Sequence, residues 1–107
     1  MSSKKITLIR HKVDVGYATL ELEDDHSGFI SDVKIYKKYR GRGYCSKLVH
    51  KIITTATKMK LKTLTLHVSS TNGPAIKCYK NNNFKIIRKN YNKRVLFGYT
   101  MRLKLKS

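Results

Sequence analysis

A short glycine-rich segment, Tyr39–Leu48 (YRGRGYCSKL), combines two glycines and two arginines with the beginning of a helical apolar pattern. A turn that runs directly into a helix presents unpaired backbone N–H groups and the positive end of the helix dipole. Both features suit a phosphate group. An ordinary solvent-exposed basic loop has the same composition. Other features of the sequence are therefore needed to distinguish a phosphate site from such a loop.

Length and composition limit the possibilities further. The chain has 107 residues, which predicts one domain, 1–107, with a single hydrophobic core. The N-terminal residues lack the apolar run of a signal peptide and no transmembrane run follows, so we expect an intracellular protein, in cytoplasm or nucleus, with no membrane partner. In a reducing compartment the two cysteines, Cys45 and Cys78, are expected to be free thiols, and a disulfide between them is the less favoured alternative.

The charge of the chain is strongly unbalanced. It has 24 Lys and Arg against 6 Asp and Glu, a formal net charge of +18, and the basic residues run from Lys4 to Lys106 without forming a separate tail. A surface of this kind attracts polyanions nonspecifically, and it also suits a specific anionic ligand. Tyr91 among basic neighbours keeps a nucleic-acid-associated protein open as one functional hypothesis.

Hydrophobic periodicity predicts the order β-β-β-α-β-α-β-β. The expected strands are Ile6–Val13, Gly16–Glu23, Phe29–Tyr36, Leu61–Val68, Phe84–Lys89 and Arg94–Leu105, with turns at Asp14–Val15 and Asn90–Lys93. One helix should begin at Gly43, and a second should begin at Asn72 and Pro74 and end at Asn83. Simple alternation in the third strand places four side chains on one face: Phe29, Ser31, Val33 and Ile35.

Two motifs then suggest a family. The segment Asp32–Ile52 (DVKIYKKYRGRGYCSKLVHKI) resembles the acetyl-coenzyme A signature of the GNAT acetyltransferase superfamily, whose turn R/Q-x-x-G-x-G/A corresponds here to Arg40–Cys45. A later segment is similar to the family pattern L-x-V followed by N-x-x-A-x-x-x-Y-x-x-x-G-F, through Leu66, Val68, Asn72, Ala75, Tyr79 and Phe84. The resemblance extends from about Lys5 to Leu105 and implies an α/β (α+β) fold, a single GNAT-like domain built on a mixed β-sheet.

The chain also departs from the family pattern. Cys45 replaces a small residue of the turn, Asn83 replaces the glycine before Phe84, and Lys37 replaces a frequent proline. Family members usually carry a strand and two helices before the segment that begins here at Lys5, and those helices wall the acceptor pocket. The resemblance therefore implies an intact cofactor half and leaves acceptor recognition open.

The resemblance implies acetyl-CoA as co-substrate and no metal. The backbone of Val33, Lys34 and Ile35 is expected to pair with the pantetheine arm. The residues expected at the pyrophosphate are Arg40, Gly41, Arg42, Gly43, Tyr44, Cys45 and Ser46. Asn72 would cap its helix and touch the cofactor, although the cap alone would explain this residue.

Two side chains are candidates for proton transfer. Tyr79 matches the family's tyrosine that protonates the departing thiolate, whereas its spacing alone favours a core tyrosine. Histidine is the side chain that ordinarily exchanges protons near neutral pH, and His67 is the expected base, with a buried structural histidine as its rival. The alternative bases are Asp32, Glu21 and Glu23.

The leading functional hypothesis is an acetyl-CoA-dependent N-acetyltransferase that acts on a primary amine, at a protein N-terminus or a lysine, by direct attack in a ternary complex. The histidine-containing strand is most similar to the N-terminal protein acetyltransferases. A catalytically weak CoA-binding regulatory protein and a basic nucleic-acid-associated protein are the alternatives. We also expect a homodimer, in which a second copy covers the exposed acceptor edge.

Overall fold

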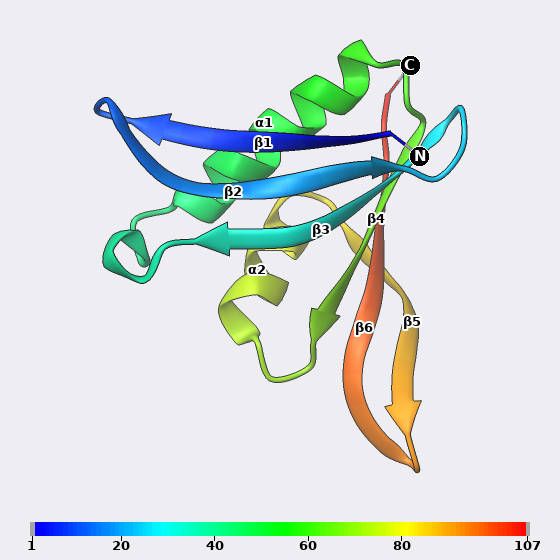
Figure 1. Ribbon diagram of the computed structural model, residues 1–107. Helices are drawn as coiled ribbons and strands as arrows, with labels where there is room; N and C mark the ends of the chain where they lie inside the picture. Colours follow the sequence, from blue (N-terminus) through cyan, green and yellow to red (C-terminus); the bar gives the residue numbers. More distant parts are fainter. Residues whose placement is uncertain (1, 107) are drawn as a thin grey trace.

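A computed structural model describes residues 2–106, which form one six-stranded sheet and two helices (Figure 1). The strands, in sheet order β1-β2-β3-β4-β6-β5, are antiparallel except for the parallel pair β3 and β4. The elements are β1 (Ser3–Arg10), β2 (Val13–Leu22), β3 (Ser27–Ile35), a short 3-10 helix η1 (Lys37–Tyr39), α1 (Tyr44–Lys58), β4 (Thr63–Ser69), α2 (Gly73–Asn81), β5 (Lys85–Asn92) and β6 (Val95–Lys104). The order predicted from the sequence is confirmed.

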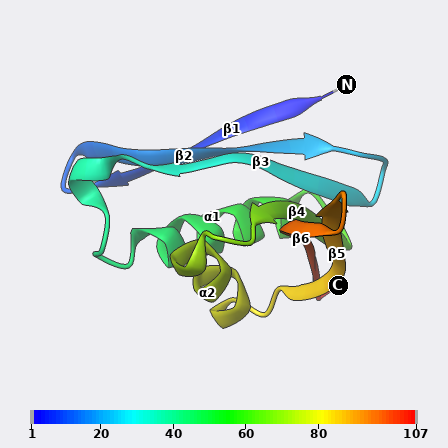
Figure 2. The ribbon, with the colours of Figure 1, turned by 90° about the horizontal axis from the view of Figure 1, so that it is seen from below.

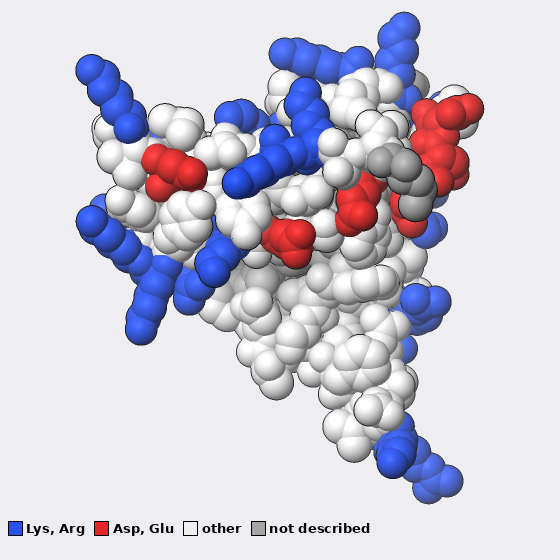
Figure 3. All heavy atoms as spheres, viewed as in Figure 1, with Lys and Arg blue, Asp and Glu red and all other residues white. Residues whose placement is uncertain are grey.

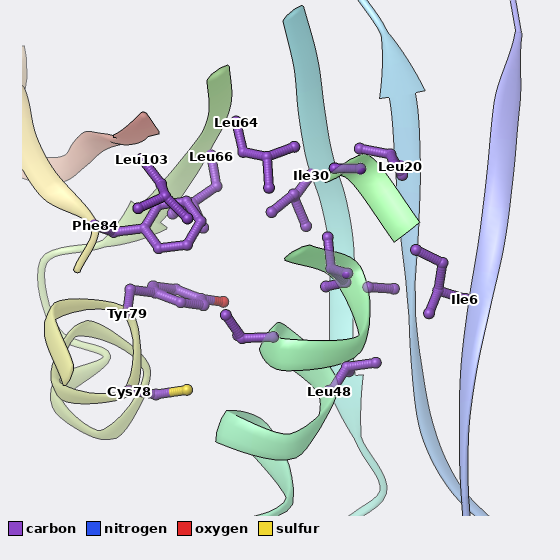
Figure 4. Close-up of a cluster of buried hydrophobic side chains, with 14 of the residues drawn as sticks. Ile6, Leu20, Ile30, Leu48, Leu64, Leu66, Cys78, Tyr79, Phe84 and Leu103 are labelled. Carbon is purple, nitrogen blue, oxygen red and sulfur yellow. The ribbon is translucent and has the colours of Figure 1, made fainter. Parts of the chain in front are cut away.

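Both helices lie on the same side of β1–β3, and no element within residues 2–106 covers the other face of these strands (Figure 2). The core fills the space between the two layers (Figure 4). The apolar stripe predicted for the first helix points into this core, where Leu48, Val49, Ile52 and Ala56 are fully buried. The β5–β6 hairpin extends away from this body (Figure 1).

Both hairpin turns differ from the sequence prediction. The β1–β2 turn is His11–Lys12, not Asp14–Val15, and the β5–β6 turn is Lys93–Arg94 instead of the longer Asn90–Lys93. All four turn residues have positive φ, as a tight two-residue hairpin requires, but none is the glycine or asparagine that normally signals such a turn. Val15 is instead a core residue of β2, 1% exposed.

A β-bulge interrupts β3. Tyr17 and Thr19 of β2 are paired with Lys34 and Ser31, so β3 contains one extra residue at this point, and Asp32 has a φ of 54°. The predicted alternation fails here because the extra residue reverses the orientation of those that follow. Val33 and Ile35 pack against the core, whereas Phe29 contacts His67 outside it.

Helix ends follow the sequence signals. The side chain of Asn72 caps α2 by accepting a hydrogen bond from the backbone N–H of Ala75 at 3.2 Å. Asn83, just after the helix, takes the left-handed conformation that was expected for it. Neither helix is long and apolar enough to span a membrane, within residues 2–106.

The cysteines contradict the prediction of free thiols. Cys45 in the first turn of α1 and Cys78 in α2 form a disulfide, with their Cα atoms 6.4 Å apart. Their sequence separation of 33 residues gave no sign of this proximity, which arises because α1 and α2 pack side by side. The disulfide ties the glycine-rich turn to the second helix.

Candidate functional site

A groove of about 1040 Å³ runs between the end of β3, the glycine-rich turn and the beginning of α2. It brings together most of the residues that the sequence singled out: Val33, Lys34, Ile35, Arg40, Gly41, Gly43, Tyr44, Cys45, Ser46, Asn72 and Tyr79. Arg42 and His67 lie outside its lining. The groove also contains residues that sequence reasoning missed, namely Tyr17, Tyr39, Lys77 and Asn81. Tyr39 lies in the glycine-rich segment but was not singled out as a site residue, and Tyr17, Lys77 and Asn81 reach the groove through the packing of β2 and α2.

The groove exists because β3 and β4 separate. The two strands are paired from Ser27 with Thr63 to Ile30 with Leu66, and no further. Beyond this point β3 and β4 diverge (Figure 1), which leaves Val33–Ile35 without a paired strand on that side among residues 2–106. An unpaired strand edge offers hydrogen-bonding groups to an extended ligand, as another strand would.

The glycine-rich turn has the geometry of an anion site. Gly41 and Gly43 have φ of 78° and 77°, a conformation that favours glycine, and a Cβ built on either would meet no protein atom within 4 Å. Gly43 is the N-cap of α1, so the first N–H groups of a 15-residue helix begin at the groove. Arg40 holds the turn in place, because its Nε donates to the carbonyl oxygen of Ile35 at 2.9 Å.

A buried asparagine fastens the opposite wall of the groove to the turn. Asn82 is 7% exposed, and its Nδ2 donates to Ser46 Oγ at 3.0 Å and to the carbonyl oxygen of Cys78 at 2.7 Å. Together with the Cys45–Cys78 disulfide, this fixes the first turn of α1 against α2. The run of three asparagines in the sequence could be assigned to a helix end but not to this contact.

Tyr79 lies where the core meets the groove. It is 5% exposed and packs against Phe84, with ring centroids 5.9 Å apart. Its hydroxyl points toward α1 (Figure 4). Burial raises the pKa of Tyr79 to about 12, because the charged phenolate is disfavoured away from water. The phenol therefore keeps its proton throughout the neutral range and is available as a donor.

His67 lies on the other face of the sheet. Leu66 and Val68 of β4 point into the core that contains Tyr79, and His67 between them points away from it. The residue is exposed, which contradicts the rival interpretation of a buried structural histidine. Its ring packs at 5.0 Å from that of Phe29 and lines a second cavity of about 740 Å³.

A chain of hydrogen bonds orients the imidazole. The Nδ1 atom of His67 lies 3.0 Å from Thr100 Oγ1, which accepts from Asn90 Nδ2 at 3.1 Å, and Arg88 Nε donates to Asn90 Oδ1 at 3.1 Å. A threonine hydroxyl can accept two hydrogen bonds. When Nδ1 donates to Thr100, Nε2 is left with a free lone pair, as a base requires.

The three carboxylates considered as alternative bases differ in how close they lie to the two cavities. Asp32 lines the groove at the bulge, and its positive φ is a backbone conformation that residues other than glycine rarely adopt. Glu21 of β2 is paired with Phe29, the residue that touches His67. Glu23 follows the end of β2 and lines neither cavity.

Comparison with known proteins agrees with this geometry. The sequence profile of the Acetyltransferase (GNAT) family matches residues 6–84, which contain the turn, β4 and α2. The chain belongs to this family. Among curated proteins it is similar to an N-acetyltransferase of Bacillus subtilis described as uncharacterized, YycN, with 31% identity over 80 residues. The match covers 72% of this chain and 51% of that protein, so the chain spans about half the length of this relative.

Solved structures share the same fold. A GNAT family acetyltransferase from Elizabethkingia anophelis with acetyl-CoA bound has a TM-score of 0.82 at 14% identity, covering 97% of this chain and 77% of that one. The ribosomal-protein-S18-alanine N-acetyltransferase of Escherichia coli has a TM-score of 0.83 at 20% identity, covering 98% and 70%. The α+β GNAT-like fold predicted from the sequence is confirmed.

Proposed function

We propose that this protein is an acetyl-CoA-dependent N-acetyltransferase that acts on a primary amine of a protein, an N-terminus or a lysine. The observation that carries the proposal is the gap that opens beyond Ile30 and Leu66. A buried tyrosine, Tyr79, lies on its helix side, and an exposed histidine, His67, lies on the other side. Acetyl-CoA would supply an activated acetyl group as a thioester.

The cofactor would lie in the 1040 Å³ groove. Backbone N–H groups of the turn and of the first turn of α1 would bind the pyrophosphate, with Gly43 as the point of closest approach. The unpaired edge at Val33–Ile35 would bind the pantetheine arm. The open space over Gly41 and Gly43 supports this placement, because a side chain at either would enter it.

Tyr79 would act as the acid. A thiolate leaves the acetyl carbon when the amine attacks, and Tyr79 Oη would donate its proton to that sulfur. The position of Tyr79 in the groove lining supports the role, and the phenol is protonated at neutral pH, as a donor must be. Cys78 is held in a disulfide and offers no nucleophilic thiolate, which favours direct attack by the amine over an acetyl-cysteine intermediate.

His67 would act as the base. An amine attacks only when its nitrogen lone pair is free, so a proton must leave the ammonium form before or during attack. His67 Nε2 would accept this proton, directly or through a water, while Thr100 holds Nδ1. The exposed position beside a cavity supports this role because an acceptor can reach it.

The proposal is tested by offering peptide N-termini, lysine peptides and polyamines with acetyl-CoA, and by following both free thiol release and the mass of the acceptor. Acetylated peptide with a matching amount of free CoA is expected. Tyr99→Phe, which removes a hydroxyl outside both cavities, serves as a control for variants of Tyr79. Tight CoA binding without transfer to any amine would contradict the proposal and favour a binding protein.

A further inference from the structure

The second cavity lies beside His67, where β4 faces the curved β5–β6 hairpin. Besides His67, its lining includes Arg88, Lys89, Tyr91 and Phe97. Strand pairing places Arg88 opposite Thr100, on the face of His67, and Lys89 opposite Tyr99, on the face of Val68. None of the described residues that line it is acidic. Gly98 allows the hairpin to approach β4 closely, since a Cβ there would lie 2.7 Å from the carbonyl oxygen of Val68.

The charges are separated along the sequence and in space. All six acidic residues lie between Asp14 and Asp32, and the chain from Val33 onward has 20 Lys and Arg and no Asp or Glu. Seven of these cations belong to residues 85–104, the hairpin segment. Figure 3 shows acidic and basic side chains mixed on the β1–β3 part of this face, and no acidic side chain on the visible part of the β5–β6 hairpin, whose tip is basic. The acidic groups visible on this face are therefore confined to the β1–β3 part.

We infer that the second cavity selects a peptide whose reactive amine is followed by acidic side chains. This inference rests on the proposed function. The positive ammonium group would approach His67 from the side that carries Glu21, which is paired with Phe29. The carboxylates that follow would lie against Arg88, and an apolar side chain between them would pack on Tyr91.

The same arrangement disfavours polyamines. Such an acceptor carries further ammonium groups along its length, and these would have to lie against the cations of the hairpin. Arg88 also holds Asn90 in the hydrogen-bond chain to His67, so its charge is fixed at the cavity wall. Lys89 takes no part in these hydrogen bonds, and its pairing with Tyr99 places it on the opposite face from His67.

The test uses two peptides that differ only in residues two to four, acidic in one and lysine in the other, together with spermidine. The parent should acetylate the acidic peptide about fivefold faster or more at low salt, and the difference should shrink as ionic strength rises. Arg88→Gln, which removes the charge and keeps an amide donor for Asn90, should weaken the preference, and Arg88→Glu should reverse it. Lys93→Glu at the hairpin turn makes the same charge change outside the cavity and should keep the ratio of the parent.

A second measurement separates this inference from the proposed function. Binding of the two peptides, labelled with a fluorophore, is followed by anisotropy with CoA present. Acetylation of both peptides at equal rates would overturn the inference while the proposed function stands. Selective binding of the acidic peptide without acetylation would leave the site in place and overturn the proposed function. Equal binding of both peptides, with RNA bound more tightly than either, would overturn the inference in favour of a polyanion surface.

Discussion

Ile30 and Leu66 are the last residues at which β3 and β4 are paired, and every element of the candidate site is arranged around the gap that opens after them. The core on the helix side of β4 holds Tyr79, and the opposite face of β4 presents His67. A tyrosine and a histidine thus lie on different sides of β4, which suits the proposed reaction, in which one group takes a proton from an amine and the other gives one to a thiolate.

CoA should stabilise the folded protein, because a ligand that binds only the folded state raises the midpoint of thermal unfolding. Gly43→Glu should abolish this rise, since it adds bulk and negative charge where the pyrophosphate would bind. Gly43→Asn is the matched control, because asparagine tolerates positive φ and is uncharged, and it should retain part of the rise. A folded Gly43→Glu variant with the CoA response of the parent would refute the placement of the cofactor.

His67→Ala should lower the rate of acetyl transfer by about 100-fold or more and remove or shift the fall in rate at low pH. Thr100→Val should lower it less, about tenfold, and also change the pH profile, because the hydroxyl that holds Nδ1 is lost. His50→Ala, an exposed histidine on α1, is the control. An unchanged pH profile in both His67→Ala and Thr100→Val would transfer the role of base to a carboxylate, with Asp32 the first to be tested.

Stability at alkaline pH should depend on Tyr79. The usual pKa of tyrosine is near 10, and burial raises that of Tyr79 to about 12. Below pH 10 the phenol is protonated in both the folded and the unfolded chain. Between these pH values only the unfolded chain loses the proton, so stability present below pH 10 is lost as pH rises, by about 2–3 kcal/mol.

Tyr79→Phe should therefore lose less stability than the parent between pH 9 and pH 12, as measured by urea unfolding at a series of pH values in about this range. Tyr99→Phe is the control, and its curve should parallel that of the parent. Equal alkaline losses in the parent and in both variants would show that Tyr79 is not the group responsible.

The disulfide predicts a dependence on reducing agents. Reduction, or Cys45→Ser with Cys78→Ser, should lower the free energy of unfolding by about 3–4 kcal/mol, because a loop of this length is then released in the unfolded chain. Denaturant unfolding with and without reductant measures the change. Two thiols that react with an alkylating agent in the native, unreduced protein would contradict the pairing.

The sequence predicted the order of the elements because their signals are local. Apolar spacing marks α1, and Asn72, Pro74 and Asn83 mark the ends of α2. The two hairpin turns were misplaced because His11–Lys12 and Lys93–Arg94 adopt positive φ without the residue types that announce it. The bulge at Asp32 was also missed. One extra residue in β3 reverses which side chains point into the core after it, and the alternation of apolar and polar residues gives no sign of it.

Most of the groove could be predicted, because its turn and its α2 wall are carried by motifs. The contacts between segments could not. The hydrogen bond from Asn82 to Ser46 joins residues 36 apart in the sequence, and the Cys45–Cys78 disulfide joins residues 33 apart. The hydrogen bonds that link His67 of β4 to Asn90 of β5 pass through Thr100 of β6. Such contacts depend on how helices and strands pack against one another, and the spacing of residues in the sequence gives no information about that packing.

The most direct measurement of the central claim is single-turnover acetyl transfer by Tyr79→Phe, alongside its affinity for CoA. The account predicts a rate lower by about 100-fold or more with nearly unchanged CoA affinity, because the ring still packs on Phe84 and only the proton donor is lost. Tyr99→Phe should behave as the parent. A Tyr79→Phe variant that binds CoA and transfers the acetyl group at the rate of the parent would contradict the claim.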